Sequence, residues 1–255
     1  MKQLPGTQKR ASRGRSRTSL SRRLMHGLGA LLVICCAATG HAGTPDSPAT
    51  SDRFVSADQP GLRVLVFGDS ISAAYGIDRA DGWATLLDAR LRALDPSFGA
   101  INASISGETT QGGAARIAHA LALHKPDVVF VELGGNDALR GYPISDTRAN
   151  LTQMLRLSRE AGASPILLGM DIPPNYGPRY RRDFRGAFVS AAEATGAFLV
   201  PFFLDGVALV DGMMQSDGIH PTAAAQARLL ATGWAALTET AGERFPALLD
   251  WDPDP

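Results

Sequence analysis

Apolar runs and helically spaced apolar positions alternate along the chain from residue 62 onward. Residues 127–133 (DVVFVEL) are almost continuously apolar, as expected of a strand that is buried on both faces. Other segments have apolar residues every three or four positions, which is typical of helices that pack by one face. The pattern predicts strands at 62–67, 100–105, 127–133, 165–170 and 197–200, and helices at 83–94, 111–123, 146–161, 179–195 and 221–237.

Strands that alternate with helices predict an α/β fold with three layers, α/β/α, around a central parallel sheet of about five strands. Two polar or cyclic residues suggest where helices begin. Thr109 or Thr110 is suited to cap the helix at 111–123, and Pro221 suits the first position of the last helix. We expect one domain over residues 61–242, followed by a C-terminal tail at 243–255.

The first 42 residues differ in composition from the rest of the chain. They hold eight Lys and Arg residues and no Asp or Glu, then an apolar run at 24–38 and small residues up to Ala42. This is the layout of a cleavable secretory signal, and the apolar run is shorter than the roughly 20 residues of a membrane-spanning helix. We expect cleavage after Ala42, a flexible lead-in at 43–60, and a periplasmic or secreted protein without a stable membrane span.

Other readings of the N-terminus are weaker. A basic tail can bind nucleic acid, but an apolar run follows this one directly. Cys36 is a candidate for lipid attachment, although Val33, Ile34 and Cys35 before it lack the usual Gly or Ala. Arg22 and Arg23 resemble a twin-arginine signal without its usual Phe, so the export route stays open.

Removal of residues 1–42 changes the charge and the cysteine content. The whole chain has 25 basic and 25 acidic residues, and the remainder has 17 and 25, a net charge of −8. An acidic protein has no electrostatic attraction to nucleic acid. Both cysteines leave with the signal, which excludes disulfides. We find no zinc-ligand cluster and no phosphate-binding loop, so no metal or cofactor is expected, and the sequence makes no prediction of oligomeric state.

Three polar segments with glycines follow the first three predicted strands. They are GDSIS at 68–72, SISGET at 104–109 and GGND at 134–137. Ligands of open parallel sheets bind beyond the carboxyl ends of the strands. The fold therefore brings these three segments together at one edge of the sheet, where we look for the chemistry.

Ser70 is the best candidate for a nucleophile, because it follows the first strand on a tight Gly-Asp turn. Ser72 is a competitor that should face another way, and capping of the next turn is the alternative role for Ser70. Among the histidines, His119 and His124 lie on a predicted helix. His220 sits in DGIHP at 217–221, where Asp217 can reach its Nδ1 and leave Nε2 as a general base; turn and cap roles are the alternative.

Acyl transfer also needs donors for the developing oxyanion. The backbone N–H groups of Ser70 and Gly107 and the side-chain amide of Asn136 are the candidates. Glycine at 107 lets the backbone approach a substrate closely, although ordinary turn formation also explains it. Asp69 and Asp137 are expected to hold their turns rather than to transfer protons.

The four segments together resemble the conserved blocks of the SGNH (GDSL-type) hydrolase family over residues 62–238. NASISGETT, LGGNDALRG and PPNYG are similar, more narrowly, to bacterial arylesterases and acyl-CoA thioesterase/lysophospholipases. The resemblance implies a flavodoxin-like sheet and a serine hydrolase that cleaves small carboxylic esters or thioesters. It implies Ser70, Asp217 and His220 as the triad, and Ser70, Gly107 and Asn136 as the oxyanion hole.

Substrate contacts are expected from Tyr75 and from the segment after the fourth strand, Ile172, Pro173, Pro174, Asn175 and Tyr176. Pro174 stands where related enzymes often have a single proline, and Tyr75 is equally suited to packing. Two rival functions remain. One is a carbohydrate acetyl esterase on the same scaffold. The other is a non-catalytic envelope protein that binds lipid or glycan, which would be expected to lack a member of the triad.

Overall fold

The computed structural model describes residues 61–250, so the predicted signal at 1–42, the lead-in at 43–60 and both cysteines lie outside the described residues. Short 3₁₀ helices lie at Arg79–Asp81, Pro174–Tyr176, Ala223–Ala225 and Pro246–Asp250. The strands and α-helices follow in the order β1 Arg63–Gly68, α1 Trp83–Leu94, β2 Gly99–Asn102, α2 Thr110–His124, β3 Val128–Glu132, α3 Gly135–Leu139, α4 Ile144–Glu160, β4 Ser164–Leu168, α5 Pro178–Thr195, β5 Phe198–Val200 and α6 Gln226–Ala241.

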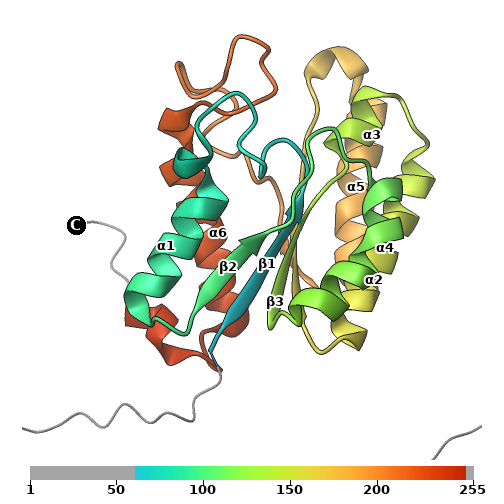
Figure 1. Cartoon of the computed structure of the whole chain (residues 1–255). Coiled ribbons are helices and arrows are strands. Elements are labelled where there is room, and N and C mark those ends of the chain that lie inside the picture. The colour runs from blue at the N-terminus through green and yellow to red at the C-terminus, as the bar shows by residue number, and fades with distance from the viewer. Residues whose placement is uncertain (1–60, 251–255) are drawn as a thin grey trace, which may run out of the picture. The chain divides into compact units, whose positions relative to one another are not determined.

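The five strands form one parallel sheet in the order β2-β1-β3-β4-β5. Helices α1 and α6 cover one face, and α2, α4 and α5 cover the other (Figure 1). The α/β fold with about five strands is therefore confirmed. Since all strands run in the same direction, the loops that leave their carboxyl ends gather at one edge of the sheet.

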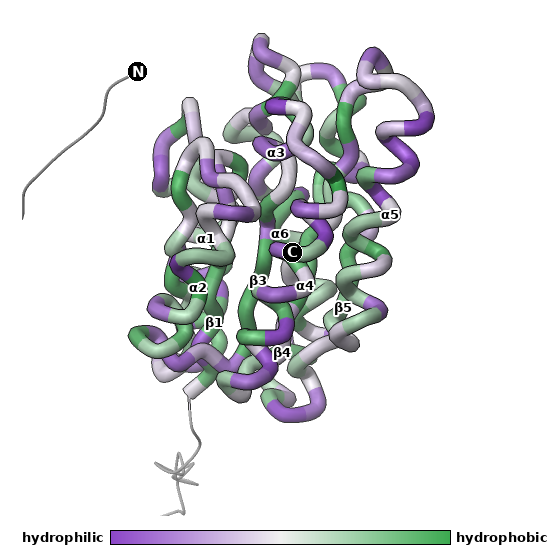
Figure 2. Tube along the Cα trace, turned by 90° about the vertical axis from the view of Figure 1, so that its right-hand side faces the viewer, coloured by the Kyte–Doolittle hydropathy of each residue, from purple (hydrophilic) through white to green (hydrophobic). Residues whose placement is uncertain are grey.

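The core lies on both faces of the sheet. The strands β1, β3 and β4 bury nearly every side chain, as their apolar runs predicted. The helices add their apolar sides, such as Leu87 and Leu91 of α1 and Met154 and Leu155 of α4. Hydrophobic residues follow the strands in Figure 2, and hydrophilic residues concentrate in the loops at the two ends. Among residues 61–250, no helix has both the length and the apolar character that crossing a membrane requires.

The start of the last helix was predicted wrongly. Pro221 does not open a helix but pairs with Met214 in an antiparallel bridge, and α6 begins only at Gln226. Two backbone bonds close this short hairpin: Gln215 N–H donates to the His220 carbonyl at 2.7 Å, and Thr222 N–H donates to Met213 at 2.8 Å. The hairpin therefore holds His220 in place from both sides.

The ordered chain also continues past residue 242, where we expected the domain to end. Phe245 packs edge-on against Phe98, and Leu248 is buried in the core. These apolar contacts anchor the segment up to Asp250. The prediction for the helix after β2 is confirmed, because Thr109 caps α2 by accepting a hydrogen bond from Gly112 N–H.

Candidate active site

Ser70 lies at the carboxyl end of β1, on the turn that begins at Gly68. The Asp69 carboxylate accepts the N–H of Ile71 at 3.1 Å, and backbone bonds from Ala73 to Asp69 and from Tyr75 to Ser70 wind the turn. The turn raises Ser70 to the edge of the sheet while leaving its side chain only slightly exposed. This is the placement that we predicted for a nucleophile.

His220 and Asp217 meet Ser70 from the hairpin before α6. The His220 Nε2 atom lies 2.9 Å from Ser70 Oγ, and His220 Nδ1 lies 2.6 Å from Asp217 Oδ2. The second oxygen of Asp217 accepts the backbone N–H groups of Ile219 and His220 at 2.9 and 3.0 Å. Gly218 makes this tight turn possible with a φ of +67°, a region that favours glycine.

The hydrogen bond from His220 lowers the pKa of Asp217 from its ordinary 3.8 to about 2. Asp217 is therefore an anion throughout the neutral range. An ionised carboxylate can only accept a hydrogen bond, so the imidazole proton lies on Nδ1 and points at Asp217. Nε2 then has no proton and can accept a hydrogen bond from the serine hydroxyl. The chain Ser70–His220–Asp217 has the donor and acceptor order that proton removal from a serine requires.

Two neighbours fix the imidazole ring. Tyr75 packs against it with a distance of 4.5 Å between ring centroids and an angle of 41° between the planes. The amide of Gln215 donates to the carbonyls of Tyr75 and Pro221 at 2.8 and 3.0 Å, which ties the nucleophile loop to the hairpin. Tyr75 thus packs against the His220 ring while half of its own surface stays exposed.

The three predicted oxyanion donors lie on three different segments at this edge: Ser70 on the turn after β1, Gly107 on the loop after β2, and Asn136 in α3. Within residues 61–250, the backbone N–H groups of Ser70 and Gly107 have no acceptor. Gly107 has a φ of +81°, and its carbonyl accepts from Arg140 at 3.0 Å. Asn136 donates one of its two amide hydrogens to Asp69 Oδ2 at 3.1 Å.

A pair of buried carboxyl groups lies beneath the nucleophile turn. Glu132 ends β3, and its Oε2 atom accepts from the backbone N–H groups of Asp69 and Ser72 and from the Ser72 hydroxyl. Burial raises the pKa of Asp69, and burial together with the nearby Asp69 raises the pKa of Glu132 well above its ordinary value. Sequence reasoning missed Glu132, although a charged residue at the end of an apolar strand is a recognisable signal.

The rival residues named from the sequence have structural roles. Ser72 is buried, and its hydroxyl donates to Glu132 at 2.7 Å and accepts from the Trp83 indole at 3.1 Å. Asp137 accepts the N–H and the hydroxyl of Thr110 at 2.9 and 2.5 Å, which fixes the start of α2. His119 and His124 lie on α2 as predicted. Among residues 61–250, no group of three or more His, Cys, Asp or Glu side chains is arranged to hold a metal ion.

Comparison with known proteins agrees with this geometry. The GDSL-like lipase/acylhydrolase family matches residues 66–228, which include all the residues proposed for the site. The chain belongs to this family. The family identifies it as an acyl hydrolase on the SGNH fold, as the resemblance of the four blocks implied.

Similar proteins include an esterase and a thioesterase. Esterase TesA of Pseudomonas aeruginosa is 50% identical over 174 residues, which are 68% of this chain and 87% of the relative. Thioesterase 1/protease 1/lysophospholipase L1 of Escherichia coli is 40% identical over 163 residues, or 64% of this chain and 77% of the relative. A crystal structure of TesA superposes with a TM-score of 0.68 at 49% identity and covers 70% of this chain and 99% of that one.

The segment expected to bind the acyl chain follows β4 at the same edge of the sheet. Ile172 is buried in the core of this acylhydrolase, while Pro173 and Asn175 are exposed. Pro174 begins the 3₁₀ helix that ends at Tyr176, and the Tyr176 ring stacks on Tyr180 at 6.4 Å between centroids. That these residues contact substrate stays a prediction.

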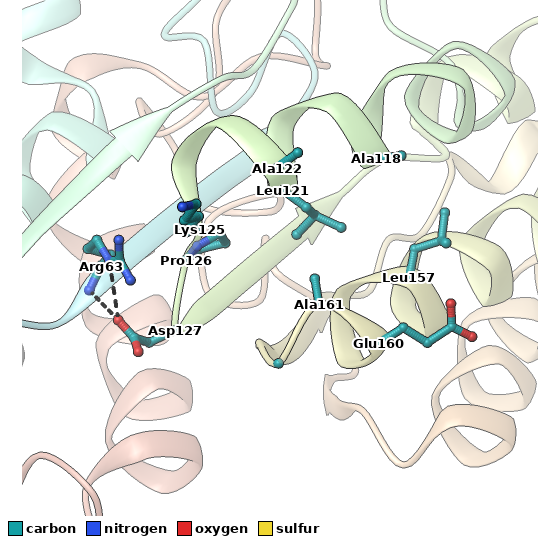
Figure 3. Close-up of a pocket in the computed structure, with 11 residues that line it drawn as sticks. Arg63, Ala118, Leu121, Ala122, Lys125, Pro126, Asp127, Leu157, Glu160 and Ala161 are labelled. Carbon is teal, nitrogen blue, oxygen red and sulfur yellow. Dashed lines mark hydrogen bonds and ion pairs between the residues drawn. The ribbon is translucent and has the colours of Figure 1, made fainter. Parts of the chain in front are cut away.

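A groove of about 680 Å³ lies at the opposite end of the sheet, where the strands begin. Figure 3 shows it between the last turns of α2 and α4, with Arg63 and Asp127 paired at its side. Apolar side chains such as Leu121 and Leu157 form much of its wall. It contains none of the residues proposed for the active site.

Proposed function

We propose that this acylhydrolase cleaves carboxylic esters and thioesters with Ser70 as nucleophile, His220 as general base and Asp217 as the group that orients the base. The observation that carries the proposal is the distance of 2.9 Å between Ser70 Oγ and His220 Nε2, with Asp217 2.6 Å from the other ring nitrogen. A serine hydroxyl becomes nucleophilic when a neutral imidazole can take its proton during attack.

In the first half of the reaction, Ser70 Oγ attacks the carbonyl carbon and His220 Nε2 takes the hydroxyl proton. The Ser70 and Gly107 N–H groups and the Asn136 amide stabilise the negative charge on the carbonyl oxygen. The carbon–oxygen or carbon–sulfur bond then breaks. His220 returns its proton to the departing alcohol or thiol, and the acyl group remains on Ser70.

In the second half, His220 removes a proton from water, which attacks the acyl carbonyl. The same three donors stabilise the second oxyanion, and the bond to Ser70 breaks as His220 gives the proton back to Oγ. The carboxylic acid leaves, and the enzyme returns to its starting state. Asp217 stays ionised throughout and stabilises the imidazolium.

The names of the relatives support the substrate class. TesA of Pseudomonas aeruginosa is an esterase, and the Escherichia coli relative is named a thioesterase and a lysophospholipase. Tyr75 and residues 172–176 are proposed to flank the acyl chain. The signal expected at residues 1–42 adds that the enzyme works in the periplasm or outside the cell.

Covalent labelling tests the nucleophile. A fluorophosphonate should label the purified protein at Ser70, as peptide mass spectrometry would show, and Ser70→Ala should not be labelled. A Ser72→Ala variant is the matched control and should keep its label. Absence of labelling would favour the non-catalytic binding protein, and hydrolysis of acetylated xylan in preference to acyl thioesters would favour the carbohydrate acetyl esterase.

A further inference from the structure

The carboxyl group of Glu132 is built into the turn that carries the nucleophile. It is completely buried, and its Oε2 atom accepts from Asp69 N–H at 3.3 Å, Ser72 N–H at 3.2 Å and the Ser72 hydroxyl at 2.7 Å. A Cβ at Gly68 would lie 2.6 Å from this oxygen. Glycine at 68 therefore makes room for the carboxyl group, so the turn and Glu132 fit each other.

The second oxygen of Glu132 has a different environment. Oε1 is buried and has no hydrogen-bond donor within residues 61–250. The Asp69 carboxyl group adjoins the Glu132 side chain, and a side-chain hydrogen bond with Glu132 is one of the influences that lower the pKa of Asp69. Two carboxyl groups in contact inside a core cannot both be ionised without a large free-energy cost, because each charge is desolvated and repels the other. One of the two therefore holds a proton, which supplies the hydrogen of the bond between them.

The surroundings decide which carboxyl group is protonated. Both carboxyl oxygens of Asp69 have a donor, because Oδ1 accepts the N–H of Ile71 and Oδ2 accepts the amide of Asn136. All three donors to Glu132 meet at Oε2, which leaves Oε1 without a donor and able to carry a proton. Burial raises the pKa of Glu132 well above its ordinary value. The proton belongs on Glu132 and the negative charge on Asp69.

We propose that Glu132 is a neutral positioning residue, which donates a hydrogen bond to Asp69 and keeps Asp69 ionised so that it orients the Asn136 amide in the oxyanion hole. This proposal rests on the proposed function, in which Asn136 stabilises the oxyanion. An Asp69 carboxylate holds one amide hydrogen of Asn136, at 3.1 Å between Nδ2 and Oδ2. The other amide hydrogen is then fixed in direction before substrate arrives, which is the preorganisation that oxyanion stabilisation needs.

A pair of variants at this position tests the proposal in the full chain. Glutamine has the same shape as a protonated glutamate, since its carbonyl can accept the three donors and its amide can donate to Asp69. Glu132→Gln should therefore keep kcat for a p-nitrophenyl ester within about twofold of wild type. Glu132→Ala removes the donor, and kcat should fall by about 10–100-fold, part of the loss of a whole oxyanion donor, with KM nearly unchanged.

Stability against pH reports the proton directly. The titratable groups around Glu132 are Asp69, which adjoins it, and His220, which acts on Asp69 when the imidazole is protonated. A carboxyl group that stays protonated in the folded protein ionises near its ordinary pKa of 4.5 in the unfolded protein. The free energy of unfolding therefore decreases as the pH rises above 4.5. Glu132→Gln cannot ionise. Its folding equilibrium constant should therefore gain on wild type with rising pH, by up to about tenfold per pH unit.

Each result has a defined meaning. A ratio of folding constants that stays flat between pH 4 and 8 would show that Glu132 is ionised in the folded protein and would overturn the proposal. So would a Glu132→Gln enzyme as slow as Glu132→Ala, or a folded Glu132→Ala enzyme with normal kcat. If Glu132→Ala does not fold, the glutamine variant still decides through its pH dependence. Failure of Ser70 labelling would refute the proposed function instead, and it would leave the stability ratio unaffected.

Discussion

The two ends of β3 place carboxyl groups in opposite environments. Asp127, just before the strand, pairs with two arginines: its Oδ2 accepts Arg63 N–H at 2.9 Å, and its Oδ1 lies 2.9 Å from Arg244 Nη2. Glu132, the last residue of the strand, has no basic partner within residues 61–250 and lies against another acid. The two arginines compensate the charge of Asp127, whereas the surroundings of Glu132 disfavour a charge on that residue.

This difference separates structural from functional polarity in the same sheet. At the amino end, the arginines are half exposed and the carboxylate is neutralised from the surface. At the carboxyl end, burial and glycine turns hold the acids, amides and imidazole in fixed positions. Groups that are costly to bury persist where a reaction uses them. We therefore expect substitutions at the carboxyl end to change the reaction and substitutions at the amino end to change stability.

The largest expected effect is at the nucleophile. Ser70→Ala should lower kcat by about 10⁴-fold or more, because among residues 61–250 no other hydroxyl is hydrogen-bonded to His220 Nε2. The measurement is turnover of a p-nitrophenyl ester, with circular dichroism to verify folding. Ser72→Ala gives the comparison, although its lost bond to Glu132 costs some stability. An unchanged rate in the Ser70 variant would remove the carboxyl end from the chemistry.

The next effect is at the oxyanion hole. Asn136→Ala should lower kcat by about 10²–10³-fold with KM little changed, since the amide acts on charge that develops only in the transition state. Steady-state kinetics on the same ester would show it. A rise in KM at constant kcat would instead mean that Asn136 binds the ground state of the substrate.

Lowering the pH should remove activity without breaking the contact between His220 and Asp217. A protonated His220 cannot accept the Ser70 proton, so kcat/KM should fall by about tenfold or more per pH unit on the acid side. Protonation of Asp69, whose pKa burial raises, acts in the same direction. The pKa of Asp217 is lowered from 3.8 to about 2 in the folded protein. The stability that its charge contributes is therefore complete above pH 3.8 and is lost as the pH falls toward 2. Activity should return on neutralisation, and a flat profile would exclude His220 as the base.

The sequence predicts the parts of this molecule that local pattern controls. Apolar runs identify all five strands, and the sheet rule with the four blocks brings Ser70, His220 and Asn136 to one edge. The shared edge follows from parallel topology alone. The distances between these side chains needed the structure, as did the contact of Tyr75 with the imidazole ring.

What sequence could not predict depends on contacts between distant segments. Pro221 is an acceptable first residue for a helix, and only its pairing with Met214 excludes it from α6. Phe245 gains its order from Phe98, which is far away in the chain. From the sequence alone, Glu132 is only the polar residue at the end of a strand. Its bonds to Asp69 and Ser72 become evident only when the turn that folds over it is known.

The smallest effect on activity is expected at the amino end. Asp127→Ala removes the acceptor of Arg63 N–H and should lower the free energy of unfolding by about 1–3 kcal/mol. Arg244→Ala removes only a half-exposed partner and should cost under about 1 kcal/mol. Urea denaturation measures both, and kcat should stay within about twofold of wild type. A large loss of kcat in a folded Asp127→Ala enzyme would mean that the two ends of β3 are coupled, because the strand between them contains only buried apolar residues and no polar relay.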